Sequence, residues 1–171
     1  VASRASFTYA TPVMPAFTDH STTLMEELNR ISPGRIAMTR GGYALVTRRE
    51  RPEDLIRELY RGYGEMTGRV RIRETATCDY APPKRTPWEE APNGVDVLLD
   101  RELIRRTFPG WAPDVAAVIH VRRAGSISSQ QMGQMMLETI RAEGGKVVRG
   151  EVRAIAAGEG FTLEVATGQG T

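Results

Sequence analysis

Apolar side chains recur at helical spacing in two stretches of the first half of the chain. The first helix is predicted to begin at Thr18 or Asp19, since both are suitable N-caps, and to end at residues 32–34, Ser-Pro-Gly. The second is predicted to begin at Pro52, because proline fits the first turn of a helix. The apolar faces consist of Leu24, Met25, Leu28 and Ile31, and of Leu55, Ile56, Leu59 and Tyr60.

Between these helices the pattern changes to the alternation that is typical of strands. Residues 36–38 alternate apolar and polar side chains, and residues 43–47 form a second strand-like run after Gly41 and Gly42. Two short strands joined by glycines are typical of a hairpin. We therefore expect these two runs to pair with each other.

A further strand is expected at residues 69–73, where Val70 and Ile72 alternate with arginines. Because acidic residues flank the arginines, the favoured interpretation is a solvated strand face; contact with phosphates is the alternative. Residues 81–93 carry four prolines and little periodicity, which predicts a long loop. The arginines concerned are Arg69, Arg71 and Arg73.

The second half of the chain begins with a short predicted strand at residues 95–99. Asp100 is expected to cap a brief helix, which ends at residues 108–110, Phe-Pro-Gly. A strand follows at residues 115–121, with His120 on the face opposite to Ile119.

Ser128 and Gln131 have the Ser-x-x-Gln spacing of a capping box and predict the start of another helix. A strand at residues 146–148 is expected to complete a crossover onto a parallel strand. Residues 152–155 and 161–165 are expected to form a hairpin across a glycine-containing turn. The buried stripe of the helix is predicted to consist of Met132, Met136, Leu137 and Ile140.

The order of these elements predicts the fold class. Helices and strands alternate without a strict β-α-β rhythm, and most strand pairs are expected to be antiparallel. The chain is therefore predicted to be α+β, with a mixed, largely antiparallel sheet and helices on one face. A helix, strand and hairpin that belong to an α/β domain are expected to follow.

Composition narrows the class of protein. Of the 171 residues, 40% are hydrophobic, enough to fill a core, and no apolar run approaches the roughly 20 residues of a membrane helix. The net charge of +2, from 23 basic and 21 acidic side chains, gives no strong field for a polyanion. We therefore expect no integral membrane segment, no nucleic-acid partner and a cytoplasmic location.

The candidate catalytic motifs in the sequence lack the spacing or the structural context that their chemistry needs. The glycines of residues 62–68 have the wrong spacing for a dinucleotide-binding turn and follow a predicted helix instead of a strand. Asp19, His20 and Ser21 are adjacent, whereas members of a catalytic triad converge from separate elements.

The remaining reactive side chains are also interpreted as structural. His120 lies on a predicted strand, and Cys78 has no marked partner base. Two histidines and one cysteine at unrelated spacings predict no metal site. By chemistry alone, the sequence therefore predicts a domain without an active site of its own.

Several segments are notable for their order along the chain. Residues 3–7, Ser-Arg-Ala-Ser-Phe, are rich in small side chains, and residues 100–110 run from an acidic residue through leucine to Pro-Gly. Residues 125–129, Gly-Ser-Ile-Ser-Ser, lead into the capped helix, which continues into residues 141–148 with Gly-Gly and a hydrophobic run. Residues 151–155 then precede the second strand of the hairpin.

This order resembles the D-amino-acid oxidase, glycine oxidase and sarcosine oxidase class of FAD-dependent oxidoreductases. Residues 100–110 are similar to its acidic-x-x-Leu and Pro-Gly segment. Residues 125–129 are similar to its Gly-x-hydrophobic-Asp-Pro segment, with serines in place of the Asp and the Pro. The likeness covers most of the chain except residues 67–93.

The resemblance implies FAD as the cofactor and a small amine or amino acid as the substrate. It implies a flavin-side loop at residues 1–15, a substrate-binding-type α+β domain at 16–124 and part of an FAD-binding domain at 125–171. An ordinary N-terminal tail is the alternative interpretation of the loop. The positions implied to contact the flavin are Ser3, Arg4, Ala5, Ser6 and, through its main chain, Val152.

The family's glycine-rich FAD fingerprint and its C-terminal half do not occur in the sequence. We therefore expect the chain to be a central fragment that is inactive alone and does not retain FAD, with the catalytic residues elsewhere. Two alternatives stay open: a non-catalytic binding or structural module, and a flavin hydroxylase-type enzyme that acts on aromatic rings. The sequence leaves the oligomeric state open.

Overall fold

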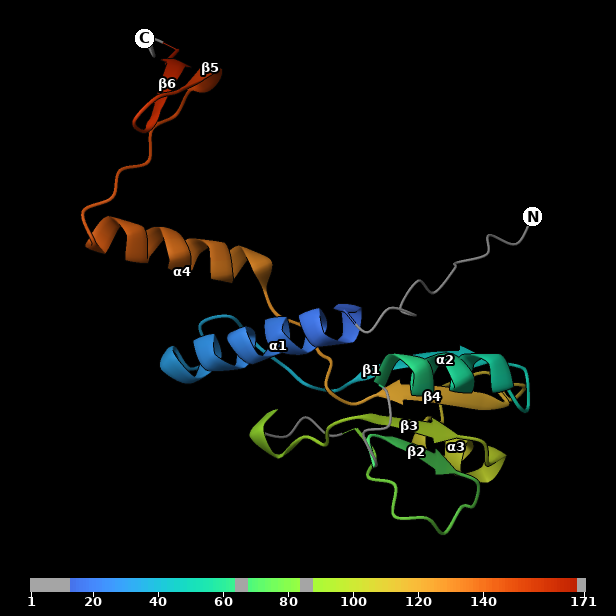
Figure 1. Ribbon diagram of the computed structural model, residues 1–171. Coiled ribbons are helices and arrows are strands. Elements are labelled where there is room, and N and C mark those ends of the chain that lie inside the picture. Colours follow the sequence, from blue (N-terminus) through green and yellow to red (C-terminus); the bar gives the residue numbers. More distant parts are fainter. Residues whose placement is uncertain (1–12, 64–67, 84–87, 169–171) are drawn as a thin grey trace. The chain divides into compact units, whose positions relative to one another are not determined.

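The structure is a computed structural model that describes residues 13–63, 68–83 and 88–168 (Figure 1). Residues 1–132 and 133–171 form two compact units, the sheet unit and the hairpin unit. The helices are α1 (Val13–Ile31), α2 (Glu53–Tyr63), the 3-10 helix η1 (Trp88–Glu90), α3 (Arg101–Thr107) and α4 (Ser129–Ala142). The strands are β1 (Tyr43–Thr47), β2 (Val70–Arg73), β3 (Val95–Leu98), β4 (Ala117–Val121), β5 (Glu151–Ala157) and β6 (Phe161–Ala166).

The sheet unit is built on a four-stranded sheet with the order β1-β4-β3-β2. Strand β4 pairs antiparallel with both β1 and β3, whereas β2 and β3 are parallel. Ile119 is the central register position, opposite Leu45 on one side and Val97 on the other. The predicted α+β class, with a mixed and largely antiparallel sheet, is confirmed.

Both faces of this sheet are covered by a helix. On one face, Val95, Val97 and Ile119 form a core with the apolar side of α2. On the other face, Leu98 and Val118 pack against α3. One helix therefore lies on each face, where the sequence favoured one face, because every residue of β3 is buried and neither face can be left to solvent.

The predicted hairpin between residues 36–38 and 43–47 is wrong. Strand β1 pairs with β4, and the segment before it is attached through a bridge between Thr39 and Ser126 and a bond from Gly42 N to Ala124 O. The apolar residues of β1 are thereby placed beside the central strand of the sheet, which buries more surface than a local two-stranded pair would.

Helix α1 begins before the predicted N-caps, at Val13. Asp19 therefore lies inside the helix and caps nothing. Its carboxylate makes an ion pair with Arg123, which also binds Glu26 with an N–O distance of 2.7 Å. Arg40 makes a second ion pair with Glu26 at 3.0 Å. In the described chain, polar contacts from these arginines therefore hold α1 beside the sheet.

Helix α4, which begins in the sheet unit and continues into the hairpin unit, and the hairpin itself agree with the sequence in part. The amide of Gln131 donates to Ser128 Oγ over 3.3 Å, so the predicted cap of α4 is confirmed, and β5 and β6 pair antiparallel. Residues 146–148 form no strand, so the predicted crossover is wrong, because no described strand offers this segment a ladder of hydrogen bonds. The expected buried stripe of α4 is also wrong: Met135 is its buried residue, while Met136, Leu137 and Ile140 are exposed.

Candidate functional site

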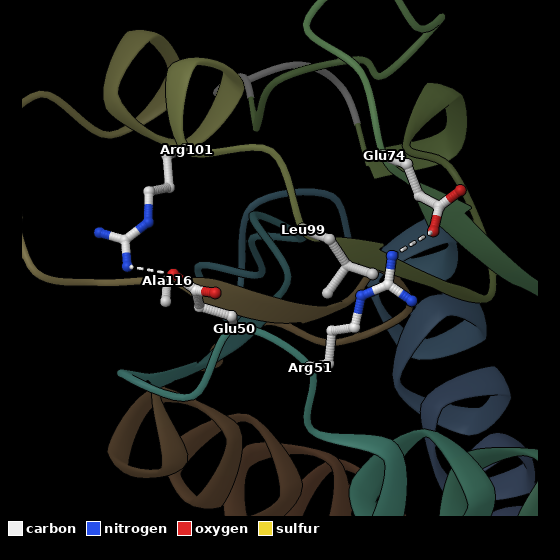
Figure 2. Close-up of a pocket in the computed structure, with 6 residues that line it drawn as sticks. All are labelled: Glu50, Arg51, Glu74, Leu99, Arg101 and Ala116. Atoms are coloured by element: carbon white, nitrogen blue, oxygen red, sulfur yellow. Dashed lines mark hydrogen bonds and ion pairs between the residues drawn. The ribbon is translucent and has the colours of Figure 1, made fainter.

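A cavity of about 410 Å³ lies at one edge of the four-stranded sheet, just beyond the ends of β1, β2 and β3 (Figure 2). Two apolar residues line it, Leu99 after β3 and Ala116 before β4. Four charged side chains complete the lining. They are Glu50 and Arg51, which follow β1, Glu74, which follows β2, and Arg101 at the start of α3.

The charged side chains of this cavity form two ion pairs on either side of Leu99 (Figure 2). Arg101 Nη2 donates to Glu50 Oε1 over 3.1 Å, and Arg51 Nη2 lies 3.9 Å from Glu74 Oε1. All four side chains are exposed, so these pairs contribute little to stability. Stabilisation of the fold therefore does not explain why these two ion pairs are present.

A second polar feature, the Asp96 cluster, lies on the α3 face of the sheet and consists of Arg71, Arg73, Tyr80, Asp96, His120 and Arg122. Asp96 is 3% exposed and accepts hydrogen bonds from Arg71 Nε at 2.8 Å and Arg73 Nε at 2.9 Å. Arg122 Nε lies 3.6 Å from its other oxygen. Strand register explains the gathering, because Asp96 is opposite Arg71 on β2 and opposite His120 on β4.

His120 is 2% exposed and fully hydrogen-bonded. Its Nδ1 lies 2.7 Å from Arg122 Nη1 and 2.9 Å from the Tyr80 hydroxyl, and its Nε2 lies 3.2 Å from the Gly41 carbonyl oxygen. Since a guanidinium only donates and a carbonyl only accepts, Nδ1 is the acceptor and Nε2 carries the proton. His120 is therefore a neutral core residue, as the sequence predicted.

Electrostatics fix the protonation states of the cluster. Burial opposes ionisation of Asp96, but hydrogen bonds from Arg71 and Arg73 outweigh it and hold the pKa of the carboxyl below its ordinary value. Burial, followed by the nearby charge of Arg122, lowers the pKa of His120. Burial raises the pKa of Tyr80 to about 12, against the opposing effect of Arg122.

At neutral pH these pKa shifts favour an ionised Asp96 and a neutral His120 and Tyr80, so the carboxylate and the guanidinium groups are the charges of the cluster. It also fixes the segment after β2 on the sheet. Arg122 Nη2 donates to the carbonyl of Ala81 over 2.7 Å, and its guanidinium lies 5.1 Å from the centre of the Tyr80 ring. Arg73 makes a further ion pair with Asp79. The geometry supports a structural part for this cluster.

The expectation of a solvated arginine face on β2 is therefore wrong. Arg71 and Arg73 are half-buried and are bound to Asp96, which the sequence did not single out. Two features of the sequence could have indicated this cluster. Arginines alternate with apolar residues along one strand, and a single acidic residue lies inside another, apolar strand. Only the register of β2 against β3 brings the two together.

One of the positions implied to bind flavin, Val152, lies in the described part of the chain. Ser3, Arg4, Ala5 and Ser6 lie outside the described residues. Val152 lies on β5 opposite Val165, and the ladder shifts by a bulge between Val152 and Ala154. The residue that the bulge leaves without a cross-strand partner is Arg153, whereas Val152 is paired in the ladder, so the implied main-chain contact of Val152 with adenine stays a prediction.

Other predicted positions are also accounted for. His20 is exposed on α1, and Cys78 is partly buried against the core beneath α3. Gly62 lies in the last turn of α2, which ends at Tyr63, and Gly68 comes after the helix; residues 64–67 are outside the described part. Among the described residues no group of three His, Cys, Asp or Glu side chains is arranged to hold a metal ion.

The comparisons with known proteins identified no relative of this chain. No family model matches the chain. A search of curated proteins found no match, and neither did a search of solved structures. Within the described residues, no helix has the length and apolar character needed to cross a membrane.

Proposed function

We propose that this chain is part of an FAD-dependent oxidoreductase that oxidises a carbon–nitrogen bond of an amino acid or secondary amine. The observation that carries the proposal is the order of the family-like segments along the sequence, two of which contain a helix cap that the sequence predicts. Asp100 caps α3 by accepting from Leu103 N at 2.7 Å, and Ser128 caps α4. Strand β5, which contains the family-like residues 151–155, follows α4.

The apolar surface of the hairpin unit supports this proposal. Ile155, Phe161 and Leu163 are 65%, 80% and 53% exposed, and they lie on one face of the β5–β6 ladder. A two-stranded ladder with a bare apolar face is marginal in water. An assembled flavin-binding domain would cover such a face.

FAD, when bound, supplies the chemistry by accepting the equivalent of a hydride from the carbon beside the amine nitrogen. The part proposed for this chain is to support that chemistry. Residues 16–124 form the substrate-side domain, and residues 125–171 complete part of the flavin domain, where the backbone at Val152 contacts adenine. A cytoplasmic location belongs to the same proposal.

The test is anaerobic reduction of the complete protein by a panel of amino acids and secondary amines. We expect at least one of them to bleach the flavin absorption and to yield an imine, which water hydrolyses to a carbonyl product and ammonia or an amine. Flavin reduction only by a nicotinamide, with hydroxylation of an aromatic compound in air, would support the hydroxylase alternative instead. Absence of both reactions together with absence of flavin would support the binding-module alternative.

A further inference from the structure

Residues 74–83, which we call the Tyr80 segment, follow β2 and belong to neither a helix nor a strand (Figure 1). The segment is anchored by Tyr80, which is 7% exposed and packs in the core beneath α3 with Leu98 and Val118. None of the positions implied to contact flavin belongs to this segment. An inference about it is therefore independent of the function proposed above.

The polar contacts at the end of the Tyr80 segment depend on one atom, Nδ1 of His120 on β4. The Tyr80 hydroxyl lies 2.9 Å from this atom, and Arg122 Nη1 lies 2.7 Å from it. The same guanidinium donates through Nη2 to the carbonyl of Ala81 over 2.7 Å. His120 Nδ1 is thus the acceptor that positions Arg122, and Arg122 in turn holds the backbone of the segment.

This arrangement requires a neutral His120 ring. Nε2 already carries a proton toward the carbonyl of Gly41, at 3.2 Å, so a second proton has to bind at Nδ1. An N–H at Nδ1 would face an N–H of Arg122, and two cations would then be in contact. The Tyr80 hydroxyl can rotate and become an acceptor, but a guanidinium cannot. Protonation of His120 therefore displaces Arg122 and breaks its bond to Ala81.

The groups around the ring oppose this proton as long as the segment is closed. Burial, followed by the charge of Arg122, lowers the pKa of His120 and outweighs the attraction of Asp96. Opening of the segment admits water and returns that pKa toward its ordinary value. The groups that face the ring are Tyr80 of the segment, Asp96 of β3, Arg122 of β4, the Gly41 carbonyl before β1 and the Phe108 ring after α3.

We propose that His120 is a pH-sensitive latch for the Tyr80 segment. While the ring is neutral, the segment is closed on the sheet unit. When a proton from solvent binds at Nδ1, Arg122 leaves Ala81 and the segment opens, whereas the four-stranded sheet stays folded. Acid favours the open segment because the open form binds the proton more readily than the closed form does.

The thiol of Cys78 is a probe of this opening, because Cys78 lies in the segment and is partly buried against the core. The complete protein is labelled with dithiodipyridine at about pH 7.5 and about pH 5, on either side of the ordinary pKa of histidine. Mass spectrometry of the peptides identifies the label on Cys78. Each labelling rate is divided by the rate for urea-unfolded protein at the same pH, which removes the pH dependence of the thiol itself.

We expect this ratio to rise at least about threefold in acid, while circular dichroism shows a folded protein at both pH values. A ratio that does not change with pH would overturn the proposal. A rise that is accompanied by loss of the circular dichroism signal would do so too, because the protein would then unfold as a whole.

Two variants assign the opening to the latch. His120→Gln has an amide oxygen for Arg122 and an amide N–H for Gly41 but gains no proton, so the ratio is expected to stay low at both pH values. Arg122→Gln removes the bond to Ala81, so the ratio is expected to be high at both. An acid-induced rise that persists in His120→Gln, or a low ratio at neutral pH in Arg122→Gln, would refute the latch.

Two further variants are controls. His20→Gln removes an exposed histidine of α1, and Asp79→Asn removes a carboxylate of the segment itself, which pairs with Arg73. Both are expected to keep the acid-induced rise in Cys78 labelling. Loss of the rise in Asp79→Asn would assign the opening to that carboxylate and would contradict the part proposed for His120.

Discussion

Asp96 is a carboxylate inside a strand whose four residues are all buried, and three guanidinium groups surround it. Arg71 binds both of its oxygens, at 2.8 and 3.0 Å. A buried carboxylate without partners would carry a large desolvation penalty. The residues around Asp96 therefore stabilise one another, because each charged group offsets the desolvation penalty of a buried charge of opposite sign.

Replacing Asp96 with Asn tests this dependence. The change leaves three arginines without their common carboxylate, and we expect the free energy of unfolding to fall by about 3–5 kcal/mol. Urea unfolding followed by circular dichroism measures it. Asp114→Asn is the control, since Asp114 pairs with Arg48 on the surface and should have little effect. Equal effects of the two changes would contradict the mutual dependence of the buried cluster.

His120 makes stability depend on pH. Its pKa in the folded chain lies below the ordinary value of 6.5, so the unfolded chain binds the proton more readily. The stabilising effect of the neutral ring is complete above the ordinary pKa of 6.5 and is lost as the pH falls from there through the lower pKa of the folded chain. We expect urea midpoints to drop as the pH falls below about 6.5, well above the range in which Asp96 titrates.

The variant His120→Gln removes this titration and is expected to flatten the pH dependence, although its stability at neutral pH is lower. His20→Gln removes an exposed histidine of α1 and should keep the dependence of the natural protein. An unchanged slope in His120→Gln would assign the pH dependence to other groups.

At the scale of elements, the segment leading into β1 depends on Gly42. Its φ of +84° is a conformation that side chains disfavour, and a Cβ there would lie 2.1 Å from Nε2 of His120. Gly42→Ala is therefore expected to lower the free energy of unfolding by at least about 2 kcal/mol, from backbone strain and overpacking. Gly41→Ala meets no atom within 4 Å and is the matched control. Similar urea midpoints for the two variants would contradict this geometry.

Elements with a local cause could be predicted from the sequence. The caps at Asp100 and Ser128 are set by neighbours three residues away, and the β5–β6 hairpin by its own turn. The partner of β1 could not be predicted, because Thr47 pairs with Ala117 far along the chain. Long-range pairing is decided by which surfaces are buried together, and a local pattern does not record it.

The site residues differ in the same way. The sequence indicates that His120 is structural, but not that Tyr80 and Arg122 are the groups that make it so. The cavity could not be predicted, since its members are spread from Glu50 to Ala116 and come from separate segments. Charges that converge from separate strands become visible only when the strand order is known.

At the scale of the whole molecule, the two units differ in how they bury apolar residues. The sheet unit has a core on each face of its sheet. In the hairpin unit, every residue of β5 is exposed, and Ile140 on α4 is 47% exposed. The proposed flavin domain would cover the exposed apolar residues of the hairpin unit, whereas the sheet unit has a core of its own.

The most direct test of the proposed flavoenzyme is the absorption spectrum of the complete protein as purified. We expect the visible bands of oxidised flavin at close to one flavin per chain, and FAD in the supernatant after denaturation. The 171-residue chain expressed alone is expected to be colourless and without oxidase activity. A complete protein without flavin bands, and unable to take up added FAD, would contradict the proposed function.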